Sequence, residues 1–418
     1  MNRLRQFWCY AQKVFTLARR LERVRDRRSQ PEIPTRAVTI TLFLGGLLRI
    51  GSRLGLEGKS RKKGWQRITG HARPISDDTL GYVLERYRLE DLRAVVREVN
   101  QDLKRNKALE SCKINGLLFV ALDANEQFHS RARCCSQCCE REVEIKDAQG
   151  CIRKVREFYH RHVYAHISGP VISTILDLEP IRPGEEECGA ALRLLGRIRR
   201  NYGPRFFDGV TVDAWYAKGP FIKAVGKLGW SVVCVLKQTR YEIYGEATRL
   251  SARQKAQEWE SHRRKIRSWD IKDLPFTDES LDAMRVVITE ERSEERTQRA
   301  GQYVREEKVR HWRWLVDASL NGYGAQTIVQ IGHRRWGVEN HGFNELTQYY
   351  DLTHCTRHEP VAMVAWLLLR VLAFNLFECF ARLHGKLWRE GRATLKSLAE
   401  DLLGALDRHE ELDLLWSD

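Results

Sequence analysis

The order of apolar segments between residues 115 and 236 restricts the folds open to this chain. Strand-like runs of β-branched and aliphatic residues come first, and helical and strand-like segments then alternate. The predicted segments are strands at 117–122, 162–167 and 171–178, a helix at 185–202, a strand at 206–213, a helix at 219–228 and a strand at 231–236. This order predicts an α/β fold built on a mixed sheet.

Two of these strands end in an aspartate, Asp123 and Asp213. The strand order matches the ribonuclease-H-like fold, in which the first and fourth strands lie side by side, so we expect the two carboxylates to lie close together. A third acidic residue, Glu339, lies in Arg334-Arg-Trp-Gly-Val-Glu-Asn340, one helical turn after Arg335. Mg²⁺ prefers oxygen ligands, and phosphate oxygens complete its shell. The three residues therefore predict a divalent-metal site that acts on a phosphodiester.

Each acidic residue also has a purely structural explanation. An aspartate after a strand commonly caps the next turn, and Arg335 and Glu339 have the spacing of an i, i+4 ion pair on a helix. Two matching strand–aspartate units in one chain favour the catalytic interpretation.

Positive charge is concentrated in the first quarter of the chain. The net charge is +16, and residues 1–110 contain 25 Lys and Arg against 12 Asp and Glu, so +13 of the excess lies there. This predicts a polyanionic partner. Apolar residues recur at helical spacing over 1–28, 39–56 and 76–103, and Ser76 is a candidate N-cap. We therefore predict that residues 1–110 form an all-helical, basic DNA-binding region.

The densest basic run in that region is the predicted loop Gly58–Gly64, with residues that follow it. Its DNA-contact candidates are Lys59, Arg61, Lys62, Lys63, Arg67 and Arg73, with Trp65 and His71 among them. Contacts with phosphates would make binding weaken steeply with salt. A solvated loop without a partner is the alternative.

Beyond residue 110 the pattern predicts four further regions. They are 111–239, the first part of the catalytic core with a cysteine-rich hairpin; 240–320, an inserted and partly β subdomain; 321–358, the end of the core with Glu339; and 359–418, a helical C-terminal region. The most apolar stretch, 361–383, is interrupted by Arg370, Asn375 and Glu378. Those residues favour a buried helix over a membrane span. The first residues lack the apolar segment of a secretory signal, so we expect a cytoplasmic, nucleoid-associated protein.

Eleven cysteines in such a protein favour free thiols or metal ligands over disulfides. Within Cys134-Cys-Ser-Gln-Cys-Cys139, the pair Cys135 and Cys138 has the spacing of a zinc knuckle. His160 shares one face of a predicted strand with His162 and His166. We predict a structural Zn²⁺ site, with a reduced cysteine-rich turn that binds no metal as the alternative. The expected ligands are Cys135, Cys138, His160 and one of Cys134, Cys139 or Cys151.

Several blocks resemble one known family. They are Leu122-Asp-Ala-Asn-Glu126, Val212-Asp-Ala-Trp-Tyr-Ala-Lys-Gly-Pro-Phe221, Arg335-Trp-Gly-Val-Glu339-Asn-x-x-Phe343-x-x-Leu346 and Val371-Leu-Ala-Phe-Asn-Leu-Phe377. They are similar to the DDE transposases of bacterial insertion sequences, in the branch with a β-rich insertion before the last acidic residue. That branch has a Tyr where this chain has Gly332, and a Lys where it has Leu346. The resemblance therefore implies that other residues, such as His333, Arg334 or Asn340, contact the DNA phosphates here.

The resemblance implies metal-dependent DNA nicking and strand transfer. Asp123, Asp213 and Glu339 would hold two Mg²⁺ or Mn²⁺ ions, and Arg335 would hold a phosphate beside them. Lys218 and Lys223, which follow Asp213, are candidates for contact with the DNA backbone.

Relatives with this insertion stack a flipped base on an aromatic side chain, and Trp312 and Trp314 are the candidates here. The alternative is that both tryptophans pack within a sheet.

The implied partners are double-stranded DNA, as terminal repeats and as target, and further copies of the chain in a dimer or larger assembly, with no membrane. A ribonuclease-H-like nuclease or resolvase, a zinc-containing DNA-binding protein derived from a transposase, and an RNA-binding protein are the rival interpretations.

Overall fold

The computed structural model describes residues 3–146, 150–261, 263–276, 283–299, 302–384 and 394–407. Parts of the predicted C-terminal helical region, 385–393 and 408–418, lie outside the described residues. The chain forms two compact units, and the backbone passes between them more than once. The first comprises Met1–Cys112, Ala124–Leu194 and Val338–Asp418, and the second comprises Lys113–Asp123 and Leu195–Gly337.

The N-terminal region of the first unit is helical, as predicted. Its helices are α1 (Arg3–Phe15), α2 (Leu17–Glu22), α3 (Thr35–Leu47), α4 (Arg53–Ser60), α5 (Lys63–Thr69), α6 (Asp77–Leu84) and α7 (Leu89–Arg105), followed by the short η1 (Ala108–Cys112). The structure corrects three details. The predicted helix over 1–28 is broken at Thr16, which has a left-handed φ of 47°. The predicted helix over 76–103 is two helices, and the predicted basic loop is the end of α4 and the start of α5.

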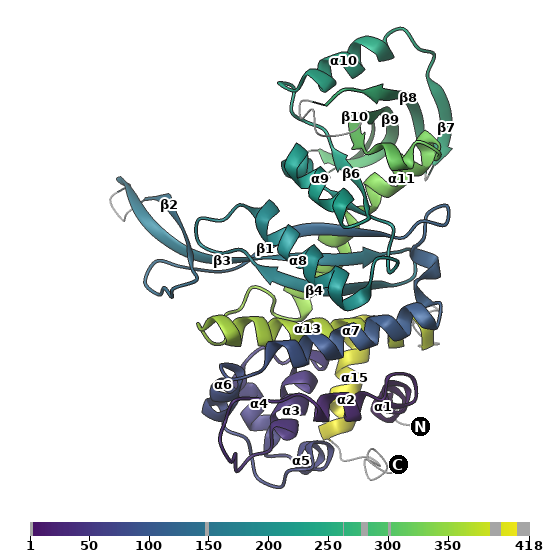
Figure 1. The fold of residues 1–418 in the computed structure, drawn as a ribbon. Helices are drawn as coiled ribbons and strands as arrows, with labels where there is room; N and C mark the ends of the chain where they lie inside the picture. The colour runs from purple at the N-terminus through teal and green to yellow at the C-terminus, as the bar shows by residue number, and fades with distance from the viewer. Residues whose placement is uncertain are drawn as a thin grey trace. The chain divides into compact units, whose positions relative to one another are not determined.

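The predicted N-cap at Ser76 is present. The Ser76 hydroxyl accepts a hydrogen bond from the Thr79 backbone N–H at 3.2 Å and so begins α6. In α7, acidic residues occupy the first turn and basic residues the last, as the helix dipole favours. Its apolar face is buried beside the long helix α13 (Pro360–Cys379), which runs along it in Figure 1.

Helix α13 is the centre of the first unit. It belongs to an apolar stretch, Pro360–His384, that is long enough to cross a bilayer, but 89% of its most apolar window is buried within the protein. Its polar residues have partners there. Asn375 donates from Nδ2 to the Ile175 carbonyl at 2.8 Å, and its Oδ1 accepts from the Ile175 N–H at 2.9 Å. These bonds satisfy backbone groups of the edge strand β4 (Ser173–Pro180), so the polar interruptions of this helix serve packing within the protein.

The central strands have the predicted connectivity. They are β1 (Phe119–Ser130), β3 (Ile152–Ser168), β4, β5 (Gly209–Val212) and β6 (Ser231–Val235), and the strand order is β4-β3-β1-β5-β6. β3 and β4 are antiparallel, whereas β1, β5 and β6 are parallel neighbours. Helix α8 (Glu187–Tyr202) connects β4 to β5, and α9 (Gly219–Lys227) connects β5 to β6. The predicted mixed α/β, ribonuclease-H-like core is confirmed.

The structure also contains strands outside this central set, and the sequence pattern indicated only those at 284–299 and 302–316, each in part. In the first unit, β2 (Cys139–Lys146) pairs along the first half of β3, and together they form the long hairpin seen in Figure 1. In the second unit, helix α10 (Glu242–Ser251) precedes β7 (Gln257–Ser261), β8 (Arg264–Leu274), β9 (Met284–Arg299) and β10 (Gln302–Val316). β10 pairs with β6, so this inserted segment extends the sheet in the order β6-β10-β9-β8-β7.

Helix α11 (Ala325–Arg334) packs against the sheet of the second unit at Gly332. A Cβ at this position would lie 2.5 Å from ring atoms of Trp314, which is fully buried. The glycine therefore allows α11 to approach β10 closely. This contact also explains why position 332 does not carry the tyrosine expected from the resemblance, because a large side chain has no space there.

We expect Gly332→Ala to lower the free energy of unfolding by about 1–3 kcal/mol, the usual cost of overpacking a core. Gly226 in α9 is a matched control, because a Cβ there would meet nothing within 4 Å. Gly226→Ala should leave stability unchanged or raise it, since alanine favours helix over glycine. Chemical denaturation followed by tryptophan fluorescence measures both variants. Equal stability of the two would contradict the close approach of α11 to Trp314.

Candidate active site and a cysteine–histidine cluster

The parallel pairing of β1 and β5 determines where the first two acidic residues lie. The paired residues are Phe119 with Gly209, Val120 with Val210 and Ala121 with Thr211, at a constant offset along the two strands. Two residues further on, the same register brings Asp123 level with Asp213. Residues level on adjacent strands are about 4.8 Å apart and point to the same face. The second unit therefore holds two half-buried carboxylates side by side. Asp213 follows the end of β5, as predicted, whereas Asp123 lies within β1, which continues to Ser130 beyond the strand end predicted from the sequence.

Asp213 also has the structural role of capping the turn that follows. Its Oδ1 accepts a hydrogen bond from the Trp215 N–H at 2.8 Å and begins the short helix η2 (Ala214–Tyr216). This bond fixes the direction of the carboxylate at the strand end. The capping role and the candidate metal-binding role therefore coexist in one side chain.

Arg335 lies beside Asp123 in the second unit. Its Nη1 donates to Asp123 Oδ2 at 3.4 Å, and the arginine is only 7% exposed. Arg335 is the C-cap residue of α11, so the packing of that helix sets the position of its backbone. The guanidinium adds a charged donor able to hold a phosphate oxygen beside the carboxylate.

Glu339 lies four residues after Arg335, in the first unit. It is half-buried in η4 (Val338–Phe343), a π-helical turn followed by α12 (Asn344–Tyr349). Between α11 and this turn, residues 335 and 336 form a turn that interrupts the helical structure. Single π-helical turns occur frequently at functional sites.

Of the two tryptophans predicted to stack on a base, Trp314 is buried and Trp312 is half-buried. Trp314 is fully buried in the core of the second unit, and Trp312 packs against that core with its ring 4.6 Å from Trp336. The two rings stack on each other on the face of β10 that is packed against the core. The packing alternative describes both residues.

A different tryptophan is exposed beside the carboxylates. Trp215, two residues after Asp213, is 54% exposed, and Lys218 Nζ lies 4.5 Å from its ring centroid. The motif around Asp213 contains two adjacent aromatic residues, Trp215 and Tyr216. Their spacing alone does not show which ring faces solvent. Tyr216, the next residue, is fully buried.

The basic candidates in the first unit differ in their surroundings. Lys59 and Lys62 both form ion pairs with Asp407, at 2.6 and 2.8 Å, and Arg61 pairs with Glu57. Trp65 is fully buried. The exposed members of the set are Arg61, Lys63, Arg67 and Arg73. The surface available to a polyanion here is therefore made by α5 and the residues that flank it.

The remaining candidates lie mainly in the second unit. Lys223 and Arg334 are half-buried, on α9 and α11, and Asn340, in the first unit, is exposed. His333 Nε2 is 2.5 Å from the buried Glu291 carboxylate, so an internal partner already holds this side chain.

The first unit contains a cluster of two thiols and two imidazoles. Cys135, Cys138, His160 and His358 each place one donor atom within 4.8 Å of all the others. The structure thus brings His358, which the sequence pattern did not indicate, to the position expected for Cys134, Cys139 or Cys151. Cys134 and Cys151 are exposed, and Cys139 Sγ is 3.7 Å from the Ile181 carbonyl oxygen.

Burial has opposite effects on the two kinds of side chain in this cluster. It lowers the pKa of His160 to about 4, with a further contribution from His358, and it raises the pKa of Cys138 to about 12. The other histidines of β3, His162 and His166, are fully buried elsewhere along the strand, and burial lowers the pKa of each to about 3.

The cap at Asp213 allows its structural and chemical roles to be separated. We expect Asp213→Ala to cost about 1 kcal/mol of stability, as the loss of a cap does, whereas Asp213→Asn retains an acceptor and should cost little. Thermal unfolding of the two variants checks this. Equal destabilisation would mean that the charge of the carboxylate, rather than the cap, matters for folding.

The family model described as the transposase DDE domain matches residues 153–376, which include Asp213 and Glu339 and make up more than half of the chain. No curated protein matches the chain. Among solved structures, it is similar to the piggyBac transposase in a synaptic complex with hairpin DNA, at 14% identity, with a TM-score of 0.40, covering 92% of this chain and 74% of that one. On the match to the family model, this chain belongs to the transposase DDE domain family.

Proposed function

We propose that this transposase binds the ends of a bacterial insertion element and catalyses metal-dependent DNA cleavage and strand transfer, with Asp123, Asp213 and Glu339 as its acidic triad. The observation that supports the proposal is the β1–β5 register, in which Asp123 and Asp213 each lie two residues beyond the last paired residues, Ala121 with Thr211. The arginine against Asp123 adds a donor suited to a phosphate oxygen. Glu339 is only four residues from that arginine along the chain.

The donor set fits Mg²⁺ or Mn²⁺. Asp123 and Asp213 offer only carboxylate oxygens at this point of the sheet, and Mg²⁺ prefers such ligands and completes its shell with water and phosphate. Bound in a pair, the ions would activate the attacking water or 3′-hydroxyl and stabilise the leaving oxygen of an in-line displacement. The side chains themselves would hold the ions, with the Asp213 carboxylate oriented by its bond to the Trp215 N–H.

Residues beside Asp213 would position the DNA. Trp215 offers an exposed ring on which a base can stack, and Lys218 carries a positive charge over that ring. Lys223, on the helix that follows, would contact the backbone. None of these roles requires a covalent bond between protein and DNA.

The other expected partners belong to the same proposal. The basic helical region at 1–110 would recognise the terminal repeats, and the exposed Lys63, Arg67 and Arg73 are its candidates for phosphate contacts. Joining two element ends requires at least a dimer on DNA. The activity would take place in the cytoplasm, at the nucleoid.

Asp123→Asn, Asp213→Asn and Glu339→Gln should each reduce Mg²⁺-dependent cleavage of element-end DNA by at least about 10³-fold, because each removes a charged metal ligand at nearly constant shape. Glu142→Gln, on an exposed part of β2, is the control with the same change of charge and should retain activity. Cleavage is measured on labelled duplexes from the DNA flanking the gene. Ordinary cleavage by either aspartate variant would refute the proposed site.

The same assay separates a transposase from a ribonuclease-H-like nuclease or resolvase. A transposase joins a supplied 3′-hydroxyl end to target DNA, whereas a nuclease uses only water as the nucleophile. Retained end binding with neither cleavage nor joining would instead favour a DNA-binding protein derived from a transposase.

Trp215→Ala should weaken the binding of element-end DNA by about 1–3 kcal/mol, the usual loss on removing a ring that stacks on a base. Trp215→Phe should retain much of the affinity, since it keeps an aromatic face. Fluorescence anisotropy on duplexes with unpaired bases near the cleavage position measures the effect. If Trp215→Ala binds as tightly as the parent protein, the exposed ring does not contact DNA.

A further inference from the structure

We propose that Cys135, Cys138, His160 and His358 bind one structural Zn²⁺, which fastens the segment before α13 to the cysteine-rich turn and to β3. This site is separate from the acidic triad and does not depend on the proposed function. All four residues belong to the first unit.

The distances between the donor atoms are those of a tetrahedral zinc site. With Zn–S near 2.3 Å and Zn–N near 2.05 Å, a tetrahedron separates two sulfurs by about 3.8 Å, sulfur and nitrogen by about 3.5 Å, and two nitrogens by about 3.3 Å. In the structure, the two Sγ atoms are 3.8 Å apart and the two Nε2 atoms are 3.2 Å apart. The sulfur–nitrogen distances are 3.5 Å from Cys135 to His160, 3.2 Å from Cys138 to His160 and 3.3 Å from Cys138 to His358. Five of the six edges of the tetrahedron therefore agree with a single ion at its centre.

Hydrogen bonds are the alternative to a metal ion in this arrangement. The two Nε2 atoms lie 3.2 Å apart, so without an ion one imidazole must donate an N–H to the other. Cys138 and His160 are buried, so bulk water does not supply the hydrogen bonds that the cluster leaves unmade. A divalent cation accepts all four lone pairs and favours the thiolate form of both cysteines.

The backbone around the cysteines has the form of a zinc knuckle. The Cys138 N–H donates to the Cys135 carbonyl at 3.1 Å, and the Cys135 N–H donates to Cys138 Sγ at 3.2 Å. An N–H directed at the sulfur stabilises a thiolate. The Phe128 ring lies 4.6 Å from the ring of His358 and covers one side of the cluster.

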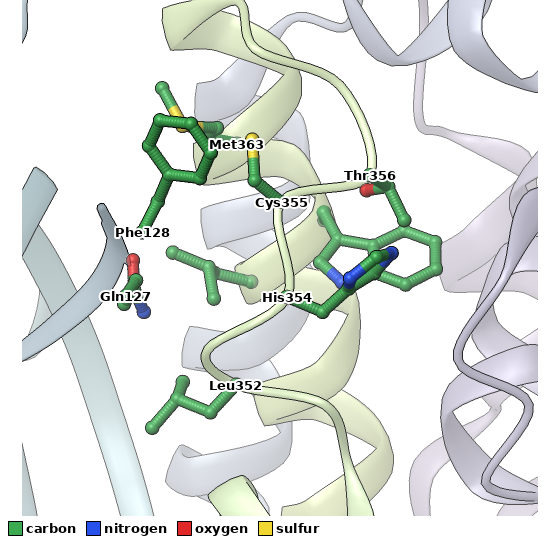
Figure 2. A pocket seen from close by; sticks show the side chains of 9 residues that line it. Gln127, Phe128, Leu352, His354, Cys355, Thr356 and Met363 are labelled. Carbon is green, nitrogen blue, oxygen red and sulfur yellow. The ribbon is translucent and has the colours of Figure 1, made fainter. Parts of the chain in front are cut away.

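A further thiol, Cys355, lies close to the cluster but lines an adjoining pocket with Phe128 and Met363 (Figure 2). Its donor atom is not one of the four that converge. Cys355 and the exposed Cys134 are therefore matched controls, because each is a cysteine within a few residues of a proposed ligand.

The ion would connect segments that are distant in the sequence. Cys138 and His358 are 220 residues apart. His358 lies between α12, which follows Glu339, and α13, the core helix of the first unit. Zinc would thus fix the course of the chain after the candidate catalytic glutamate, without taking part in the chemistry.

The experiment is elemental analysis of the full chain, purified without added metal or chelator, together with the absorption spectrum of the Co²⁺-substituted protein. We expect about one zinc per chain, and thiolate charge-transfer and tetrahedral ligand-field bands with Co²⁺. Cys138→Ser and His358→Asn should lose the stoichiometric metal and the spectrum. Cys134→Ser and Cys355→Ser should retain both.

Parent protein that contains no zinc and gives no tetrahedral Co²⁺ spectrum would overturn the proposal, as would stoichiometric iron. Loss of zinc from Cys134→Ser or Cys355→Ser, with retention in His358→Asn, would overturn the choice of ligands. If the ligand variants fail to fold, the parent spectrum and the two control variants still decide. Metal content is independent of DNA cleavage, so a failure here is distinguishable from a failure of the proposed function.

Discussion

The parallel pairing of β1 with β5 is the constraint on which the rest of the site depends. A slip of one residue would turn one carboxylate to the opposite face of the sheet. The structure fixes the register at the start of β5, where the Asp208 N–H donates to the Leu118 carbonyl at 2.8 Å and Asp208 Oδ2 accepts from the Leu118 N–H at 2.7 Å. At Gly209 a Cβ would lie 2.5 Å from the Phe119 ring and 2.7 Å from the Ser231 carbonyl oxygen, so no larger residue fits between the strands. The register fixed at the start of β5 therefore also sets the position of Asp213, which follows the last residue of that strand.

The inserted strands connect that sheet to the helix that carries Arg335. Because β10 pairs with β6, the insertion returns the chain to the edge of the central strands before α11 begins. A fully buried arginine, Arg285, stabilises this region through paired bonds of 2.7 Å to Asp270 and a bond of 2.8 Å to the Leu320 carbonyl. Burying a charged arginine is costly, and here its hydrogen bonds to Asp270 and to the Leu320 carbonyl offset that cost. Because these partners meet only when the strands are correctly paired, the buried arginine favours this one arrangement of strands. The insertion is thereby part of the structure that supports the candidate site.

In the first unit, long-range polar contacts have a comparable role. Asn100 and Asn375, from two different helices, both donate to the Ile175 carbonyl, at 3.0 and 2.8 Å. Arg370 of α13 donates to the Ile50 carbonyl at 2.8 Å and stacks on Trp366, and burial lowers its pKa to about 9. The cysteine–histidine cluster adds a further connection to the segment that leads into α13. Helix α13 is thereby tied to the sheet and to the other helices by directional bonds as well as by its apolar surface.

The sequence alone determined the features that depend on neighbouring residues. Alternating and 3.6-residue apolar patterns indicated the central strands and most helices. Ser76 indicated the start of a helix, and the spacing of Cys135 and Cys138 indicated a turn in which the two thiols converge. The sequence pattern did not indicate β2, β7 and β8, because their many charged residues give no strand-like apolar pattern. Only the tertiary structure decided that His358 completes the cluster, that Trp215 rather than Trp314 faces solvent, and that Gly332 meets a tryptophan ring. The reason is physical: periodicity shows which residues share a face, whereas burial of that face and contact with a residue hundreds of positions away depend on the packing of the whole chain.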